Sequence, residues 1–181
     1  MEVNFEQLLQ QSNQIKNYIQ SEVLPLPDDV LNRKKTEKNW SALEVVDHLN
    51  KVYDIYLPLF TQALTGAPEL GDYSASKKQS TLLGRLSIYS MRPKGAKRKF
   101  KMKTFDFFRP SEHTKKETIE TFLKNKETYN QLIKQARTKN LTGIKMPTSL
   151  GKRVKFYVPE CFEFILAHEQ RHMVQIAEAV E

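Results

Sequence analysis

The segment that decides the fold reads Phe162-Glu-Phe-Ile-Leu-Ala-His168-Glu-Gln-Arg-His172-Met-Val-Gln-Ile-Ala-Glu178. Its apolar residues recur at helical spacing, which predicts one amphipathic helix with both histidines on the inward face. The residues of that face are Cys161, Ile165, His168, His172, Ile176 and Ala179. Because His168 and His172 lie one turn apart, their neutral imidazole rings can bind the same divalent metal ion.

A second helix starts at Trp40-Ser41-Ala-Leu-Glu44 and runs through Leu59. Ser41 and Glu44 have the spacing of a capping box, and Trp40 is placed to act as a hydrophobic staple. We expect Pro58 to kink or break its last turns. His48 falls within the apolar stripe of this helix, so its ring is expected to point inward.

Two further long helices are expected at about 4–22 and 111–138, and a short one at 81–91. Proline and glycine place connections at 24–27 and 65–72, a turn at 146–151, and a long irregular crossing at 92–110. Four main helices with a long crossing between the second and the third indicate an all-α fold, a four-helix bundle. The length predicts a single domain, 1–181.

Composition indicates a cytoplasmic protein. Cys161 is the one cysteine, which excludes an internal disulfide and favours a reducing compartment. The first residues lack the basic and apolar regions of a secretion signal, and no apolar run is long enough to cross a bilayer. We therefore expect no membrane partner.

Positive charge is concentrated between Lys77 and Arg109, where Asp106 is the one acid. Within the basic segment 92–109, phenylalanines alternate with lysine and arginine, as in proteins that stack single-stranded nucleic acid. These are Phe100, Phe105, Phe107 and Phe108. The interpretation we favour is that the rings anchor the crossing to the bundle while the lysines face water, which makes nucleic acid the less favoured partner.

His48, His168 and His172 together predict a three-histidine site. Three protein ligands leave coordination positions open, which is typical of catalytic zinc, whereas structural zinc has four. The competing interpretation is that these are core histidines bonded to ordinary neighbours. The fourth histidine, His113, lies in a polar setting and is expected to be solvated.

Residues 168–172 also match H-E-x-x-H, the zinc-protease signature. We do not favour a protease, because such enzymes usually take their third ligand from further along the chain. Glu169 could then be an exposed helix residue or a general base. Glu44 could orient His48, although capping already explains it. Cys161 lies about 10 Å along the helix from His168 and is expected to pack in the core.

Four segments resemble the DinB/YfiT-like superfamily. Trp40 to Leu49 is similar to its second-helix motif, and Ile165 to Ile176 is similar to its last helix. Lys101 to Pro110 resembles the basic crossing of the DinB-like branch, and the 147–151 turn is similar too. The spacing of the three histidines is the most specific part of the resemblance.

The resemblance implies a four-helix bundle in up-down-down-up order, often a homodimer. It implies that His48, His168 and His172 bind a divalent ion, nickel or zinc. Characterised members include S-transferases and an isomerase that use a low-molecular-weight thiol, and others are classed as metal-dependent hydrolases.

Three functional hypotheses follow. The first is an enzyme whose metal activates water or a thiol against a small electrophilic substrate, as a hydrolase or a thiol S-transferase. The second is a nucleic-acid or phosphate-binding protein that uses residues 92–109. The third is a metal-bearing protein without catalysis, related to stress. No residue in the sequence selects the reaction or identifies a catalytic side chain.

Overall fold

The computed structural model describes residues 4–70, 79–95, 97, 104–111, 114–149 and 151–181, apart from the side chain of Lys152. The chain is mostly helical with one small sheet of two strands. The α-helices are α1 (Phe5–Tyr18), α2 (Asp28–Asn32), α3 (Ala42–Thr65), α4 (Leu82–Met91), α5 (Glu117–Ala136) and α6 (Val158–Val180). A π-helical turn η1 (Ile19–Val23) follows α1, and a 3-10 turn η2 (Asp106–Phe108) precedes α5.

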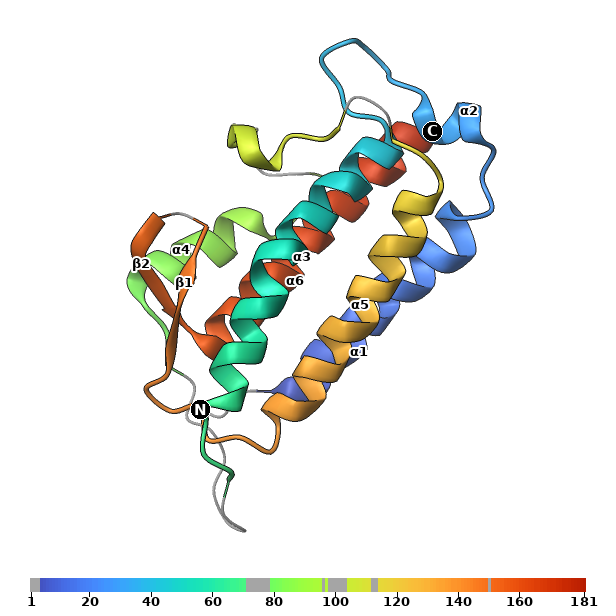
Figure 1. Cartoon of the computed structure of the whole chain (residues 1–181). Helices are drawn as coiled ribbons and strands as arrows, with labels where there is room; N and C mark the ends of the chain where they lie inside the picture. Colours follow the sequence, from blue (N-terminus) through green and yellow to red (C-terminus); the bar gives the residue numbers. More distant parts are fainter. Residues whose placement is uncertain (1–3, 71–78, 96, 98–103, 112–113, 150) are drawn as a thin grey trace.

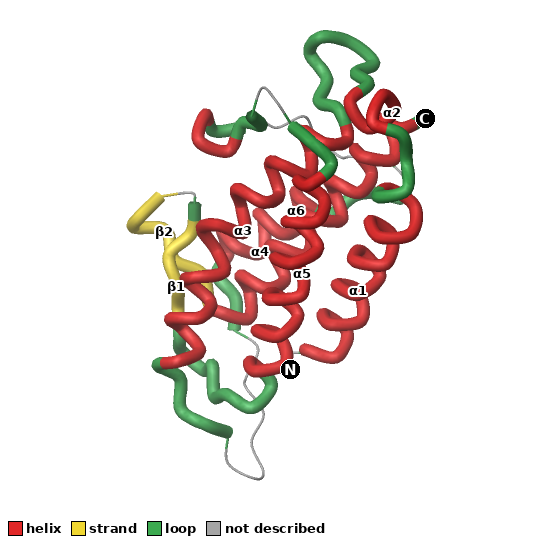
Figure 2. The backbone as a smooth tube through the Cα atoms, turned by 45° about the vertical axis from the view of Figure 1, so that its right-hand side comes forward, coloured by secondary structure: helices red, strands yellow, loops and turns green. Residues whose placement is uncertain are grey.

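The four long helices α1, α3, α5 and α6 lie side by side (Figures 1 and 2). In Figure 1 α1 and α6 run in one direction and α3 and α5 in the other. Large aromatic rings fill the space between them. The rings of Phe60 in α3 and Phe162 in α6 stack with centroids 4.0 Å apart, and Tyr129 in α5 packs on both. The Tyr129 hydroxyl donates to the Phe162 carbonyl at 2.8 Å, which satisfies a polar group within this core.

The predicted start of the second long helix is confirmed. Ser41 Oγ accepts from the Glu44 amide at 3.2 Å, and the Glu44 carboxylate accepts from the Ser41 amide at 2.8 Å. Both amides would otherwise lack partners at the helix end. The helix continues through Pro58 to Thr65, so the possible break at Pro58 is excluded.

The short helix expected at 81–91 is confirmed as α4, which packs on α6. The contact is close because Glu160 of α6 reaches back to the start of α4. Its carboxylate accepts from the Thr81 amide at 2.8 Å and from the Tyr157 amide at 3.3 Å. Gly84 leaves the space that the carboxylate occupies. One buried acid therefore caps the first turns of two helices.

The turn expected at 146–151 is shorter than predicted: Ser149 lies in a turn, whereas residues 146–148 and Gly151 belong to the strands of a β-hairpin. Strands β1 (Lys145–Thr148) and β2 (Gly151–Tyr157) pair antiparallel, with a register shift between Pro147 and Thr148. Met146 pairs with Phe156, and both side chains are buried. The alternation of buried and exposed residues was present in the sequence. Proline is tolerated here because the two-stranded sheet has only edge strands.

The crossing between α4 and α5 is irregular over its described residues, as expected, apart from η2 and an isolated bridge between Lys94 and Lys97. The expectation that its aromatics anchor it holds for Phe108, which is buried. It is wrong for Phe105 and Phe107, which stack on each other and are 51% and 57% exposed. Phe100 and residues 101–103 lie outside the described residues.

Within the described residues, no helix combines the length and the apolar character needed to span a bilayer.

Substituting Gly84 tests the close contact of α4 with α6. A Cβ at Gly84 would lie 2.2 Å from the Glu160 carboxyl carbon, so Gly84→Ala forces apart the two helix starts. We expect it to lower the free energy of unfolding by about 1–3 kcal/mol, measured by urea titration. Gly66→Ala is the matched control, since its Cβ would meet its nearest neighbour at 3.7 Å. Equal stability of the two variants would contradict the contact.

Candidate metal centre

Three histidines from two helices meet in the protein interior. His48 lies on α3, and His168 and His172 lie one turn apart on α6. The Nε2 atom of His168 is 3.3 Å from Nε2 of His48 and 3.1 Å from Nε2 of His172. All three side chains are buried. The structure therefore brings together the three histidines predicted from the sequence, although His48 and His168 are 120 positions apart in the chain.

The hydrogen bonds of two rings fix which nitrogen carries the proton. His48 Nδ1 is 2.8 Å from the Phe108 carbonyl oxygen, which can only accept, so Nδ1 holds the hydrogen. His172 Nδ1 donates in the same way to the Gln175 amide oxygen at 3.0 Å. The Nε2 atoms of both rings therefore present lone pairs to His168 Nε2. A proton on that atom can satisfy only one of them.

This donor set fits a divalent cation. Nitrogens about 2.0–2.1 Å from a tetrahedral zinc ion are about 3.3–3.4 Å apart, close to the 3.3 and 3.1 Å that separate His168 Nε2 from the other two Nε2 atoms. The three ligand atoms all lie within 4.8 Å of one another. Imidazole nitrogen suits nickel as well as zinc. A proton donated from the far nitrogen to an oxygen acceptor is the usual support of a metal-binding histidine. His48 and His172 both have that support.

His168 is supported differently. Its Nδ1 is buried and has no hydrogen-bond partner among the described residues. Its ring instead stacks on Phe164 of the same helix, with centroids 6.3 Å apart and planes at 16°. On its Nδ1 side this ring is therefore held by packing rather than by a hydrogen bond.

Aromatic side chains enclose the cluster. The Trp40 ring lies 5.1 Å from that of His48 and stacks on His172 at 6.5 Å, and the Phe108 ring meets His48 edge-on at 5.9 Å. The staple position of Trp40 thus belongs to the wall of the site. Apolar walls disfavour the charged form of an imidazole.

Burial accordingly lowers the pKa of all three histidines. For His48 the lowering by burial is opposed by the hydrogen bond to Phe108. The pKa values of His168 and His172 are well below the ordinary histidine value, first from burial and then from the other rings and Arg171. The three rings are therefore neutral near pH 7, the form that binds metal.

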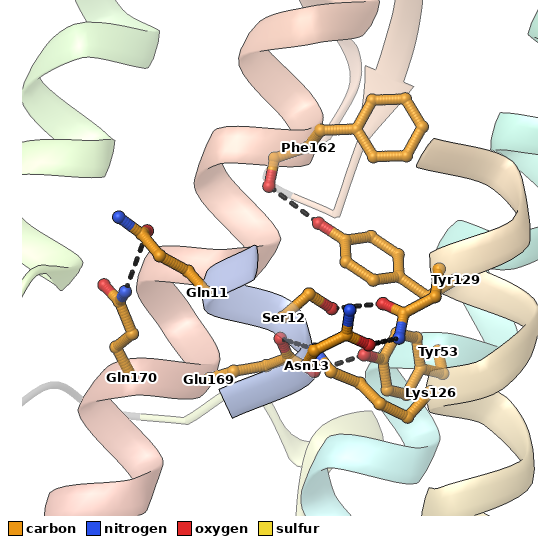
Figure 3. Close-up of polar contacts among 10 residues, drawn as sticks. Gln11, Ser12, Asn13, Tyr53, Lys126, Tyr129, Phe162, Glu169 and Gln170 are labelled. Carbon is orange, nitrogen blue, oxygen red and sulfur yellow. Dashed lines mark hydrogen bonds and ion pairs between the residues drawn. The ribbon is translucent and has the colours of Figure 1, made fainter. Parts of the chain in front are cut away.

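The glutamate of H-E-x-x-H points away from the histidines. Glu169 is 1% exposed, so the expectation of an exposed residue is wrong. Its carboxylate accepts from Lys126 Nζ of α5 at 2.5 Å and from the Tyr53 hydroxyl of α3 (Figure 3). Both partners are buried. With its carboxylate bonded to these two side chains, Glu169 is not available to act as a base beside the histidines.

The other residues considered from sequence lie outside the cluster. Glu44 is bound in its capping box and to Lys34 Nζ at 2.6 Å, so capping is confirmed as its role. Cys161 is a buried free thiol whose pKa burial raises, and it packs in the core as expected. His113 lies outside the described residues.

Sequence reasoning missed two supports of the site and the buried lysine. Gln175 could have been found, because it lies on the helix face of His172, three positions on. Lys126 falls on the inward stripe of α5, between Phe122 and Tyr129, which marks it as a buried charge in need of a partner. The Phe108 support had no signal, because a backbone carbonyl has no sequence signature.

Comparison with known proteins identifies the family. The sequence model of the DinB superfamily matches residues 14–176, nearly the whole chain. The chain belongs to the DinB superfamily. Searches of curated proteins and of solved structures gave no significant match.

The lowered pKa values predict how stability of the metal-free protein depends on pH. In the unfolded chain the histidines titrate near pH 6.5, so below that value the unfolded state binds protons that the folded state excludes. The unfolding free energy should therefore fall as the pH drops below about 6.5. Urea unfolding of chelator-treated protein between about pH 7.5 and pH 5 measures this.

The variant His168→Leu should show a shallower decline, since it removes one of the excluded protons. A wild-type stability that rises on acidification over this range would show that the rings are not held neutral.

Proposed function

We propose that the chain is a metal-dependent enzyme of the DinB superfamily, with His48, His168 and His172 as the ligands of a divalent ion, nickel or zinc. The observation that supports this most directly is the convergence of three Nε2 atoms, two of them lone-pair donors. Three protein ligands leave an open coordination position for a small molecule. Helices α1, α3, α5 and α6 would be the up-down-down-up bundle of a single domain, 1–181.

The residues around the site suit chemistry on a small electrophile. A divalent ion held there lowers the pKa of water or of a low-molecular-weight thiol, so that either becomes nucleophilic at neutral pH. Trp40, Phe108 and Phe164 exclude bulk water and favour an apolar substrate portion. The neutral rings add no positive charge of their own. We therefore propose a hydrolase or a thiol S-transferase.

Family membership further supports a homodimer. The single, buried cysteine suits the reducing cytoplasm, where a low-molecular-weight thiol is abundant.

Metal content tests the proposal. Protein purified without chelator is expected to hold about one nickel or zinc ion per chain, measured by elemental analysis, whereas His168→Ala and His172→Ala should each lose most of it. The control is His113→Ala, which should bind as much as the wild type. Equal metal in all four proteins would end the proposal. A turnover screen of the loaded protein with thiol cosubstrates then separates an enzyme from a metal-bearing protein without catalysis.

A second candidate function is binding of single-stranded nucleic acid by the basic segment 92–109. The observation that favours it is the exposed, stacked pair Phe105 and Phe107, whose ring planes lie at 9°, beside Arg109. Exposed rings flanked by cations are the platforms on which single-stranded bases stack.

Mobility-shift titration of single-stranded DNA and RNA at low salt tests this function. If it is correct, Phe105→Ala and Phe107→Ala should each weaken binding by about 1–3 kcal/mol per stacked base, and salt should weaken it further. Tyr89→Ala, which alters an exposed ring on α4, should have no effect. The absence of any shift with wild-type protein at low salt would dispose of it.

A further inference from the structure

Two charged side chains of α3, Asp47 and Lys51, bind residues 109–111 at the end of the crossing that leads to α5. Lys51 Nζ donates to the Arg109 carbonyl at 2.5 Å and to Ser111 Oγ at 3.1 Å. Asp47 Oδ2 accepts from the Ser111 amide at 2.7 Å and lies 3.2 Å from Lys51 Nζ. One ion pair within a helix thus binds a carbonyl, a hydroxyl and an amide of residues 109–111.

Asp47 and Lys51 lie on either side of His48 in the sequence. The chain segment that they contact also supports the His48 ring. Phe108 supplies the carbonyl that accepts from His48 Nδ1, and its own side chain is buried against that ring. The segment 108–111 begins at the last residue of the short turn η2 and has no strand partner. Its position relative to α3 therefore depends on the side chains that α3 offers.

We infer that Asp47 and Lys51 are positioning residues of the metal site, acting through segment 108–111 on His48. They hold the Phe108 carbonyl where it keeps the proton on Nδ1 and leaves the Nε2 lone pair facing His168. The inference rests on the proposed function for its purpose, but the orientation of His48 can be measured without metal.

The energetics agree with a positioning role. The side chains of Lys51 and Asp47 are 28% and 18% exposed, and an ion pair near the surface contributes little to stability. The pair is therefore a weak source of stability. Its specific effect is geometric, because it fixes two backbone groups and one hydroxyl group of residues 109–111, next to the carbonyl that supports His48. Mutation of residues that support a metal ligand commonly lowers metal affinity by about 10–100-fold.

The first measurement is the tautomer of His48 in chelator-treated protein, read from nitrogen-15 chemical shifts of the imidazole. Wild-type protein is expected to show the Nδ1–H form. Asp47→Ala and Lys51→Met should shift His48 toward a mixture of both forms, while His172 keeps its own. The matched controls are Asp54→Ala, two turns along α3, and Lys124→Met on α5, both exposed in the structure.

The second measurement is affinity for zinc, by competition with a chromophoric chelator. Asp47→Ala and Lys51→Met should each weaken binding about tenfold, with unchanged far-ultraviolet circular dichroism. Lys51→Arg, which keeps donors, and Asp47→Asn, which keeps an acceptor for the Ser111 amide, should recover most of the affinity. A role limited to stability would not follow this pattern of rescue.

The outcomes separate the two proposals. If the wild type binds zinc and neither the tautomer nor the affinity changes in Asp47→Ala and Lys51→Met, the positioning role is overturned and the metal site stands. If the wild type binds no metal but the tautomer changes, His48 is positioned as inferred and the proposed function fails. Should Lys51→Met not fold, Asp47→Ala still decides through the tautomer measurement, because it removes the acceptor of the Ser111 amide.

Discussion

The buried ion pair between Lys126 and Glu169 is the interaction on which the arrangement of helices at the site depends. It joins α5 to α6, and the Tyr53 hydroxyl on the same carboxylate adds α3. Removing one partner of such a pair commonly costs about 3–5 kcal/mol, because the other charge remains buried without compensation. Burial lowers the pKa of Lys126 and raises that of Tyr53. Both groups are buried donors, and the Glu169 carboxylate accepts a hydrogen bond from each of them. Moving the carboxylate away would leave both donors buried without this acceptor.

That constraint also sets the rotation of α6. Glu169 directly follows His168, and adjacent residues on a helix differ in direction by about 100°. With Glu169 directed toward α5 and Tyr53, His168 is directed to another side of α6, where His48 lies. Residues 168–172 thus use two faces of one helix, one for an ionic contact in the core and one for the histidine cluster. The sequence matches the zinc-protease pattern, but its glutamate binds Lys126 and Tyr53 in the core.

The surroundings of the cluster then decide its chemistry. Aromatic walls and burial keep the rings neutral, and two oxygen acceptors fix the Nδ1 protons of His48 and His172. One acceptor comes from the same helix as its histidine, which makes it a local feature. The other comes from Phe108, at the end of the crossing, and depends on contacts between residues about sixty positions apart. The crossing is therefore part of the site as well as a connection.

Much of the fold could be predicted from sequence because its signals are local. Helical spacing located α1, α3, α5 and α6, and the Ser41–Glu44 capping box located the start of α3. The hairpin at 145–157 was missed, because Pro147 and Gly151 suggest a turn when the pairing of Met146 with Phe156 is unknown. Pro58 suggested a possible break, yet α3 continues through it to Thr65.

The sequence by itself determined that His48, His168 and His172 lie on inward helix faces, since one helical period settles which residues share a stripe. Tertiary structure alone decided that the three Nε2 atoms meet, that Glu169 turns to Lys126, and that the Phe108 carbonyl holds His48. The physical reason is that spacing along a helix fixes a direction about its axis only. Which groups face one another depends on how the helices are rotated and packed, and long-range contacts between buried polar groups set that rotation.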